Sequence, residues 1–233
     1  MSFEIICENC AAPSSPSVGL CPYCKAIMTT EESKKLPAFS KLKTLYKEGK
    51  SSSALFLAKT VLEQDKKYSE DPSVLLICAK IMIETEGPNS KVKSLLARAY
   101  VMEPENGEIS DYMELVDAKY EMSRGNKTHG REMLTKILRR SPNHVHAHFL
   151  LGAHLYWDNS DPYAAIPHLE KCLILHPNFL RAWACLATIA RKIGNTSLAE
   201  RALRRCLELE SGGSMKQYFE KLMAETKGVK SAA

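Results

Sequence analysis

The stretch from Pro142 to Ser211 contains one sequence pattern twice, and this repetition limits the folds that the chain can adopt. Residues 143–176 (NHVHAHFLLGAHLYWDNSDPYAAIPHLEKCLILH) align with residues 178–210 (NFLRAWACLATIARKIGNTSLAERALRRCLELE), so Pro142-Asn143 recurs as Pro177-Asn178 after 35 residues. The position equivalent to Pro177 in the next copy is Ser211, 34 residues further on. A period near 34 residues predicts a unit of two antiparallel helices joined by a turn.

The residues that match between the two copies resemble the tetratricopeptide repeat. In the first copy His148, Leu151, Gly152 and Leu155 are followed by Ala165, Leu169, Cys172 and Pro177; in the second, Trp183, Leu186, Ala187 and Ala190 are followed by Gly194, Ala199, Leu203 and Cys206. Two helices approach closely only where side chains are small, so we expect Gly152 to face Ala165 and Ala187 to face Ala199. The resemblance implies an all-α fold, a right-handed α-solenoid of stacked hairpins.

Weaker copies of the same unit extend toward the N-terminus. Apolar residues recur at helical spacing, and breaks at Gly49, Gly87-Pro88 and Gly125-Asn126 separate the two helices of each hairpin. We therefore predict about five hairpins over residues 37–70, 72–104, 107–142, 143–177 and 178–211. A C-terminal capping helix from about residue 214 should cover the last hairpin, because a solenoid otherwise leaves an apolar face in water. The solenoid domain spans residues 37–227, and residues 228–233 are expected to be frayed.

Two pairs of cysteines near the N-terminus predict a metal site. Cys7 and Cys10 form one CxxC pair, and Cys21 and Cys24 form another after ten intervening residues. Four thiolates complete the tetrahedral shell that structural zinc adopts, so we expect one Zn ion per chain, bound by these four residues. Residues 1–30 resemble a short zinc ribbon, although Ala11 and Lys25 stand where such ribbons usually carry glycine. Residues 31–36 then form a polar linker to the solenoid.

Two other interpretations of these cysteines are less favoured. Cys-Pro-Tyr-Cys alone is similar to the active site of glutaredoxins, but only twenty residues precede it, too few for the sheet which that site requires. A rubredoxin-like iron site uses the same four ligands. Rubredoxin needs a packed aromatic core, whereas Phe3 and Tyr23 are the only aromatic residues in this segment. Structural zinc is therefore favoured over iron.

The tetratricopeptide resemblance also implies a binding groove, lined by the first helix of each hairpin. Carried over residue by residue, the partner-binding positions are Tyr112, Lys119, His146, Phe149, Tyr156, Trp157, Arg181 and Arg191. Tyr, Trp, Phe and Arg are enriched among residues that dominate binding energy, so these positions favour a protein or peptide partner with apolar and acidic character. The alternative is that Phe149 and Trp157 pack against neighbouring repeats.

Four histidines in the fourth hairpin, His144, His146, His148 and His154, raise the question of a second metal site. His144 and His148 lie one helical turn apart. His148 takes the position that tryptophan holds in the following copy, so we expect it to be packed. Metal binding by this cluster is the less favoured interpretation, since histidine is common both on surfaces and in cores.

These patterns favour a non-catalytic adaptor that binds a partner peptide or helix. We find no catalytic motif, so no enzyme activity and no small-molecule substrate are expected. The alternative is a nucleic-acid-associated regulator that uses the ribbon and the basic fifth repeat; the formal charge of only +5 makes nucleic acid the weaker choice. The chain has no secretory segment at its N-terminus and no apolar run long enough to span a bilayer, so we expect no membrane insertion and a cytoplasmic location.

Overall fold

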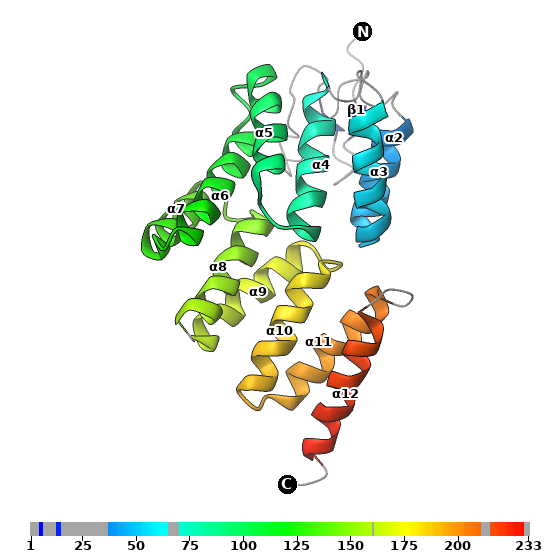
Figure 1. Cartoon of the computed structure of the whole chain (residues 1–233), viewed down its shortest axis with the longest axis vertical. Coiled ribbons are helices and arrows are strands. Elements are labelled where there is room, and N and C mark those ends of the chain that lie inside the picture. The colour runs from blue at the N-terminus through cyan, green and yellow to red at the C-terminus, as the bar shows by residue number, and fades with distance from the viewer. Residues whose placement is uncertain are drawn as a thin grey trace.

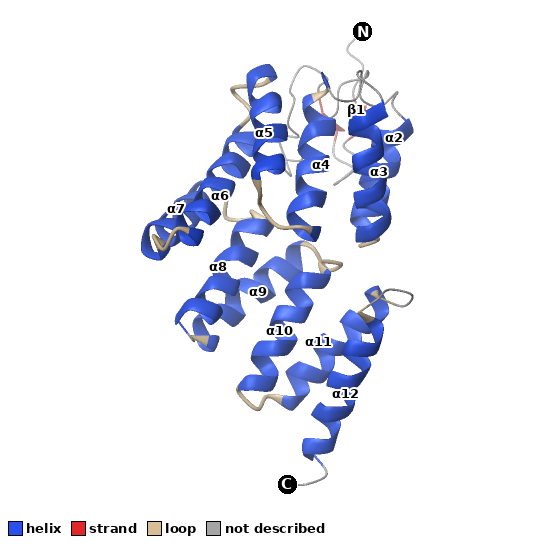
Figure 2. Cartoon of the chain, in the orientation of Figure 1, coloured by secondary structure: helices blue, strands red, loops and turns tan. Residues whose placement is uncertain are grey.

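Antiparallel helix pairs follow one another through the computed structural model, which describes residues 5–6, 13–14, 37–64, 70–159, 161–210 and 215–230. Eleven helices are present in these ranges, and consecutive helices pack against each other (Figure 2). They are α2 (Pro37–Lys47), α3 (Ser51–Gln64), α4 (Pro72–Thr85), α5 (Ser90–Met102), α6 (Gly107–Ser123), α7 (Lys127–Arg140), α8 (Val145–Asn159), α9 (Pro162–Leu175), α10 (Leu180–Lys192), α11 (Thr196–Leu209) and α12 (Lys216–Lys230). The prediction of an all-α hairpin array is confirmed.

Two short strands precede the helices. The strand β1 (Ile5–Ile6) pairs antiparallel with β2 (Pro13–Ser14), with Ile5 opposite Ser14 and Ile6 opposite Pro13. The four cysteines predicted to bind zinc, Cys7, Cys10, Cys21 and Cys24, lie outside the described residues, as does the linker 31–36. The zinc ribbon therefore stays a prediction.

Local sequence signals explain where the helices begin and end. Asp71, Asn89, Asn106 and Asn195 each accept a hydrogen bond from a backbone N–H in the first turn of the helix that follows. The first helices of four hairpins end just before Gly49, Gly87, Gly125 and Gly194, and all four glycines have a positive φ. Only glycine adopts this conformation at little cost, so the turns form at the positions where the repeat pattern breaks.

Close approach of the two helices within a hairpin occurs where small residues were expected. A Cβ atom added to Gly152 in α8 would lie 3.0 Å from the backbone oxygen of Ala165 in α9. Ala187 and Ala199 are also buried, in α10 and α11 respectively. Leucine and isoleucine side chains fill the core on both sides of these contacts, as in the fully buried Leu134 and Leu169.

The last helix, α12, covers the fifth hairpin as predicted. Phe219 and Thr226 are buried in this contact, while Leu222 and Met223 are partly buried against the core. The helix continues through Gly228 to Lys230, so it ends later than the boundary that we predicted at Lys227. A glycine weakens a helix but removes no backbone hydrogen bond, which explains why Gly228 does not end it.

The array curves toward the face formed by the first helices of the hairpins, so that first helices from its two halves come into contact. We call this curvature the bend of the array. Helices α2 to α7 form the upper half in Figure 1, and α8 to α12 form the lower half. Side chains at the N-terminal ends of α8 and α10 contact the C-terminal ends of α2 and α4. No helix among the described residues combines the length and the apolar character needed to cross a membrane.

Candidate functional site

The eight predicted groove residues do not share one environment. Tyr112, His146 and Phe149 are only 4%, 0% and 5% exposed, which corrects the prediction that they face a ligand. They are buried because the bend of the array brings α4 and α10 against the same face of α6 and α8. Five predicted residues keep at least part of their surface in solvent: Lys119, Tyr156, Trp157, Arg181 and Arg191.

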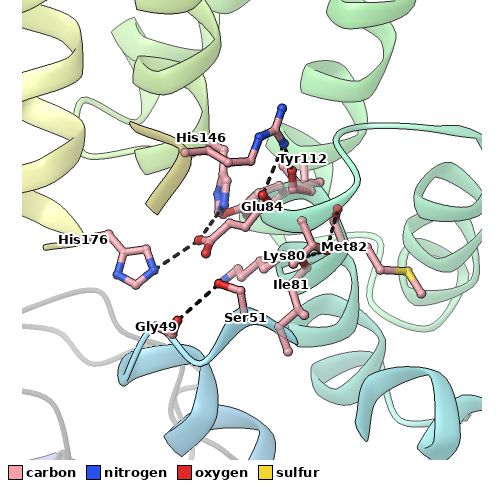
Figure 3. Close-up of polar contacts among 12 residues, drawn as sticks. Gly49, Ser51, Lys80, Ile81, Met82, Glu84, Tyr112, His146 and His176 are labelled. Atoms are coloured by element: carbon pink, nitrogen blue, oxygen red, sulfur yellow. Dashed lines mark hydrogen bonds and ion pairs between the residues drawn. The ribbon is translucent and has the colours of Figure 1, made fainter. Parts of the chain in front are cut away.

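The buried residues belong to a polar cluster that we call the junction, defined as Glu84, Tyr112, His144, His146 and His176. Glu84, in the last turn of α4, is its centre (Figure 3). The Nε2 atom of His146 lies 3.0 Å from Oε1 of Glu84, and Nδ1 of His146 lies 2.7 Å from the Tyr112 hydroxyl. Nε2 of His176 lies 3.2 Å from the same Glu84 oxygen, at ion-pair distance but without hydrogen-bond alignment. The junction therefore joins the second, third and fourth hairpins.

The hydrogen bonds assign the protons in the junction. Burial raises the pKa of Glu84, but His146 and His176 outweigh burial and hold that pKa below its usual range, so the carboxylate is charged. Burial lowers the pKa of His146 despite the neighbouring carboxylate, so its imidazole is neutral at pH 7. A neutral His146 can donate from Nε2 to Glu84 while its Nδ1 accepts from the Tyr112 hydroxyl. Each of these polar atoms then has a partner.

The N-terminal end of α10 adds contacts that hold the two halves together. Nη1 of Arg181 donates to the backbone oxygens of Ile83 at 3.0 Å and Glu84 at 3.3 Å. Its guanidinium also lies 5.3 Å from the centre of the Phe149 ring. Nδ2 of Asn178 donates to the backbone oxygen of Lys47 at 2.7 Å. Both side chains thus satisfy carbonyl groups that a helix leaves free at its C-terminus.

The junction resembles a proton relay, but its burial assigns it a structural role. Burial raises the pKa of Tyr112 well above the ordinary tyrosine value, so its hydroxyl keeps its proton at neutral pH. Lys80 lies over the Tyr112 ring at 5.4 Å and pairs with Glu108 at 2.5 Å. With His146 and Tyr112 screened from solvent, a substrate cannot reach these groups in this conformation. The junction stabilises the bend of the array.

Sequence reasoning missed Glu84, although the sequence contained a signal for it. Every residue from Val74 to Ala79 and from Ile81 to Glu84 is buried in α4. An apolar helix of this kind must be covered on all sides, including the side that would otherwise line a groove. A single acidic residue at the end of such a helix requires a buried partner, and the histidines of the fourth hairpin supply it.

Two of the groove residues that keep surface in solvent, Tyr156 and Trp157, lie near the C-terminal end of α8. Trp157 is 63% exposed, and its ring packs edge-on against Tyr156 with centroids 4.8 Å apart. Nearby, Nζ of Lys119 lies 3.3 Å from Nε2 of His154, whose Nδ1 lies 2.8 Å from Asp158. Lys127 pairs with Asp158 at 2.9 Å, which links the start of α7 to the end of α8. This end of α8 therefore carries the exposed Trp157 ring, and the ammonium groups of Lys119 and Lys127 contact His154 and Asp158 of the same helix.

Arg191, the last predicted groove residue, contacts the capping helix. Its Nη2 lies 2.7 Å from Glu225 of α12. The four cysteines outside the CxxC pairs, Cys78, Cys172, Cys185 and Cys206, are buried and free. Burial raises the pKa of Cys78 to about 12 and that of Cys185 to about 11, so these thiols carry almost no thiolate at neutral pH.

We expect acidification to destabilise the fold, because His144 of the junction is buried in its neutral form. Burial, followed by the nearby His146 and Lys80, lowers the pKa of His144 to about 3, against about 6.5 in an unfolded chain. The unfolded chain binds more protons below pH 6.5, so this stabilisation is complete above 6.5 and is lost as pH falls toward 3. We expect the free energy of unfolding to fall by about 1.4 kcal/mol per pH unit for this group.

The variant His144→Asn tests this assignment. Nδ1 of His144 accepts a hydrogen bond from the Ala147 backbone N–H in the first turn of α8. Asparagine can also accept this bond but does not titrate, so it should retain the cap and flatten the pH profile. Urea unfolding at pH 7, 6 and 5 measures the slope for both proteins. Equal slopes would show that His144 is not a source of the pH dependence.

One of the comparisons with known proteins bears on the fold. No protein-family model and no curated protein matches the chain. Among solved structures, TTC0263, a thermophilic TPR protein of Thermus thermophilus, matches with a TM-score of 0.50 and 17% identity, covering 81% of this chain and 96% of its own. A MamA structure matches with a TM-score of 0.40 and 19% identity over 73% of this chain and 94% of its own. MamA of AMB-1 matches with a TM-score of 0.39 and 21% identity, covering 76% of this chain and 100% of its own. The likeness to TTC0263 shows that the described helices form a tetratricopeptide-like array.

Proposed function

We propose that this protein is a non-catalytic scaffold that binds a segment of a protein partner at the exposed end of the first-helix face. The observation that carries the proposal is the large exposed surface of Trp157, which lies on a first helix of the array beside Tyr156. Tryptophan contributes large binding energies at interfaces, and burying its ring in a partner would remove apolar surface from water. The binding surface comprises Lys119, Tyr156, Trp157 and Arg191.

The charges on this surface favour a partner segment with acidic residues. The surface contributes two positive charges, Lys119 and Arg191, and Lys127 borders it at the start of α7. These three charges outnumber the two nearby carboxylates: Asp158, which pairs with Lys127 and contacts His154, and Glu225, which pairs with Arg191. Burial lowers the pKa of His154, so the imidazole between Lys119 and Asp158 is neutral at pH 7. An apolar segment with flanking Asp or Glu residues would complement both the rings and the remaining positive charge.

Capture of the partner with full-length protein, followed by titration of the captured protein, tests the proposal. Trp157→Ala should weaken binding about thirtyfold, which corresponds to about 2 kcal/mol, because it removes the main apolar anchor. Phe56→Ala is the matched control, since Phe56 is 74% exposed but lies on α3, a second helix. The proposal fails if Trp157→Ala and Lys119→Ala both keep full affinity while their melting temperatures are unchanged.

We further propose that residues 1–30 hold one structural zinc ion through Cys7, Cys10, Cys21 and Cys24. The support is the donor set, four thiols in two CxxC pairs, since thiolates are the usual ligands of closed zinc sites. The other four cysteines do not compete because they are dispersed and buried.

Metal analysis tests this assignment. Purified full-length protein should contain about one equivalent of zinc, and Cys21→Ser should contain close to none. A mercurial reagent should release the zinc as it titrates the four CxxC thiols, whereas Cys78→Ser should leave the zinc content unchanged. A red iron chromophore in protein purified without added metal would contradict the zinc assignment.

Nucleic-acid binding by the basic fifth repeat has less support. Within this repeat Arg191 pairs with Glu225, Arg201 with Glu170 at 3.6 Å, and Arg205 with Glu208. Pairing with carboxylates reduces the positive field that would attract a phosphate backbone.

A further inference from the structure

Two histidines of the fourth hairpin face each other across the α8–α9 contact. The Nδ1 atoms of His148 in α8 and His168 in α9 lie 3.0 Å apart, and the ring centres are 5.3 Å apart. Both side chains are half-buried, so the pair is held by packing and still borders solvent. Neither residue belongs to the junction or to the proposed binding surface.

The other ring nitrogen of His148 fixes its tautomer. Nε2 of His148 lies 3.0 Å from the backbone oxygen of Pro142. In the next repeat the indole N–H of Trp183 donates to the backbone oxygen of Pro177 at 2.7 Å, at the equivalent position. Since a carbonyl only accepts, the proton of neutral His148 lies on Nε2, so in the metal-free protein its Nδ1 accepts a hydrogen bond from the Nδ1–H of His168. A backbone carbonyl that orients the second ring nitrogen is the usual support of a metal-binding histidine.

The repeat does not need this pair of imidazoles for packing. The positions of His148 and His168 correspond in the fifth repeat to Trp183 and Ala202. That hairpin, α10 with α11, forms with one large and one small side chain at these positions, and Ala202 is fully buried. The fourth hairpin thus has two imidazoles where a tryptophan and an alanine are enough for the fifth to fold. The imidazoles also bring two ring nitrogens to face each other.

We propose that His148 and His168 form a two-imidazole binding site for a divalent late transition metal, Cu²⁺ or Ni²⁺ in preference to Zn²⁺. With metal–nitrogen bonds of about 2.0–2.1 Å, a 3.0 Å separation of the nitrogens sets an angle of about 91–97° at the metal. That is the angle between neighbouring ligands in square-planar and octahedral shells, which Cu²⁺ and Ni²⁺ adopt. Tetrahedral zinc would require the nitrogens to be about 3.4 Å apart.

The surroundings of the pair agree with this choice of metal. Burial lowers the pKa of both His148 and His168, so both rings are neutral at pH 7. His168 can give a lone pair from Nδ1 when its proton moves to Nε2, and the metal then replaces the hydrogen bond between the two rings. Among the described residues no group of three or more His, Cys, Asp and Glu side chains is placed to hold a metal, so water would complete the shell. Imidazoles without carboxylates select Cu²⁺ and Ni²⁺ over Mg²⁺ and Ca²⁺. Lys171 contributes a positive charge near His148, so we expect modest affinity and reversible binding.

Calorimetric titration of the full-length, zinc-loaded protein with Ni²⁺ tests the site. We expect one Ni²⁺ per chain and tighter binding of Ni²⁺ than of added Zn²⁺. The variant His148→Trp, His168→Ala places the side chains of the fifth repeat in the fourth, so it should fold and lose this binding. The single variant His168→Gln should weaken binding at least about tenfold, and it keeps the test valid if the double variant does not fold.

A matched control and a zinc measurement make the result decisive. His129, whose side chain is 63% exposed in α7, is not part of the pair, so His129→Gln should bind Ni²⁺ like the unaltered protein. A chromogenic chelator should detect no zinc released during the titration. Binding that survives in the double variant, disappears in His129→Gln, or is matched by released zinc overturns the proposal. Tighter binding of Zn²⁺ than of Ni²⁺ also overturns it.

Discussion

Glu84→Ala should lower the free energy of unfolding by about 3 kcal/mol, the upper part of the range for a hydrogen bond to a charged group. The side chain is 6% exposed and meets both His146 and His176. Its loss leaves the His146 N–H without an acceptor in a site that water does not reach, and an unsatisfied buried donor is costly. The contacts between the two halves of the array should weaken together.

Glu86→Ala is the matched control for this prediction. Glu86 lies two residues beyond Glu84, but it is exposed and pairs at 2.6 Å with Lys59 on the surface. Removing a surface ion pair should cost about 1 kcal/mol or less. Urea unfolding of both variants, followed by circular dichroism, measures the difference. Equal and small losses in the two variants would mean that the junction contributes little to holding the halves together.

The hairpin array could be predicted from the sequence because its determinants are local. Helical periodicity, turn glycines and capping residues act over a few positions, so the boundaries of the hairpins follow from the chain itself. The 35-residue spacing of Pro142 and Pro177 set the repeat length, and the structure places α8 and α10 accordingly. Gly152 faces Ala165 as expected, because two hairpin helices can approach only at small side chains.

Local sequence signals could not predict that part of the proposed groove is buried. Tyr112, His146 and Phe149 occupy positions that face a ligand in the tetratricopeptide family, and local periodicity gives the same pattern whether that face is open or covered. The bend of the array, which brings residues about 60 to 130 positions apart into contact, decides between the two. Small rotations at each repeat add up over several hairpins, and no single stretch of sequence encodes their sum.

The bend also affects where a partner can bind. Arg181, predicted to contact a ligand, uses its guanidinium to satisfy the carbonyls at the end of α4. Asn178 does the same for α2, and a Cβ atom added to Gly49 would lie 2.8 Å from the Asn178 Cβ. With these groups committed to contacts inside the molecule, the part of the first-helix face that remains open is the end near Trp157. The proposed binding surface is thus smaller than the groove which the family pattern implies.

The third hairpin reverses the arrangement of small residues seen in the fourth. In the fourth hairpin the glycine, Gly152, is on the first helix; in the third, Gly130 is on the second helix and faces Ala118 of the first. A Cβ atom added to Gly130 would lie 2.7 Å from the backbone oxygen of Ala118 and would overlap with the side chain of Met122. Met122 can change rotamer, but the carbonyl belongs to α6 and cannot move alone.

Gly130→Leu should therefore destabilise the protein by at least about 3 kcal/mol, the upper part of the range for overpacked cores, since α6 and α7 must separate to admit the side chain. Gly107→Ala is the control, because a Cβ atom at Gly107 has nothing within 4 Å and sits at the start of α6, where alanine favours the helix. Thermal unfolding should show a much lower melting temperature for Gly130→Leu and an unchanged or slightly higher one for Gly107→Ala. If Gly130→Leu melts like the unaltered protein, α6 and α7 are not in close contact at this point, and the third hairpin is packed differently from the fourth.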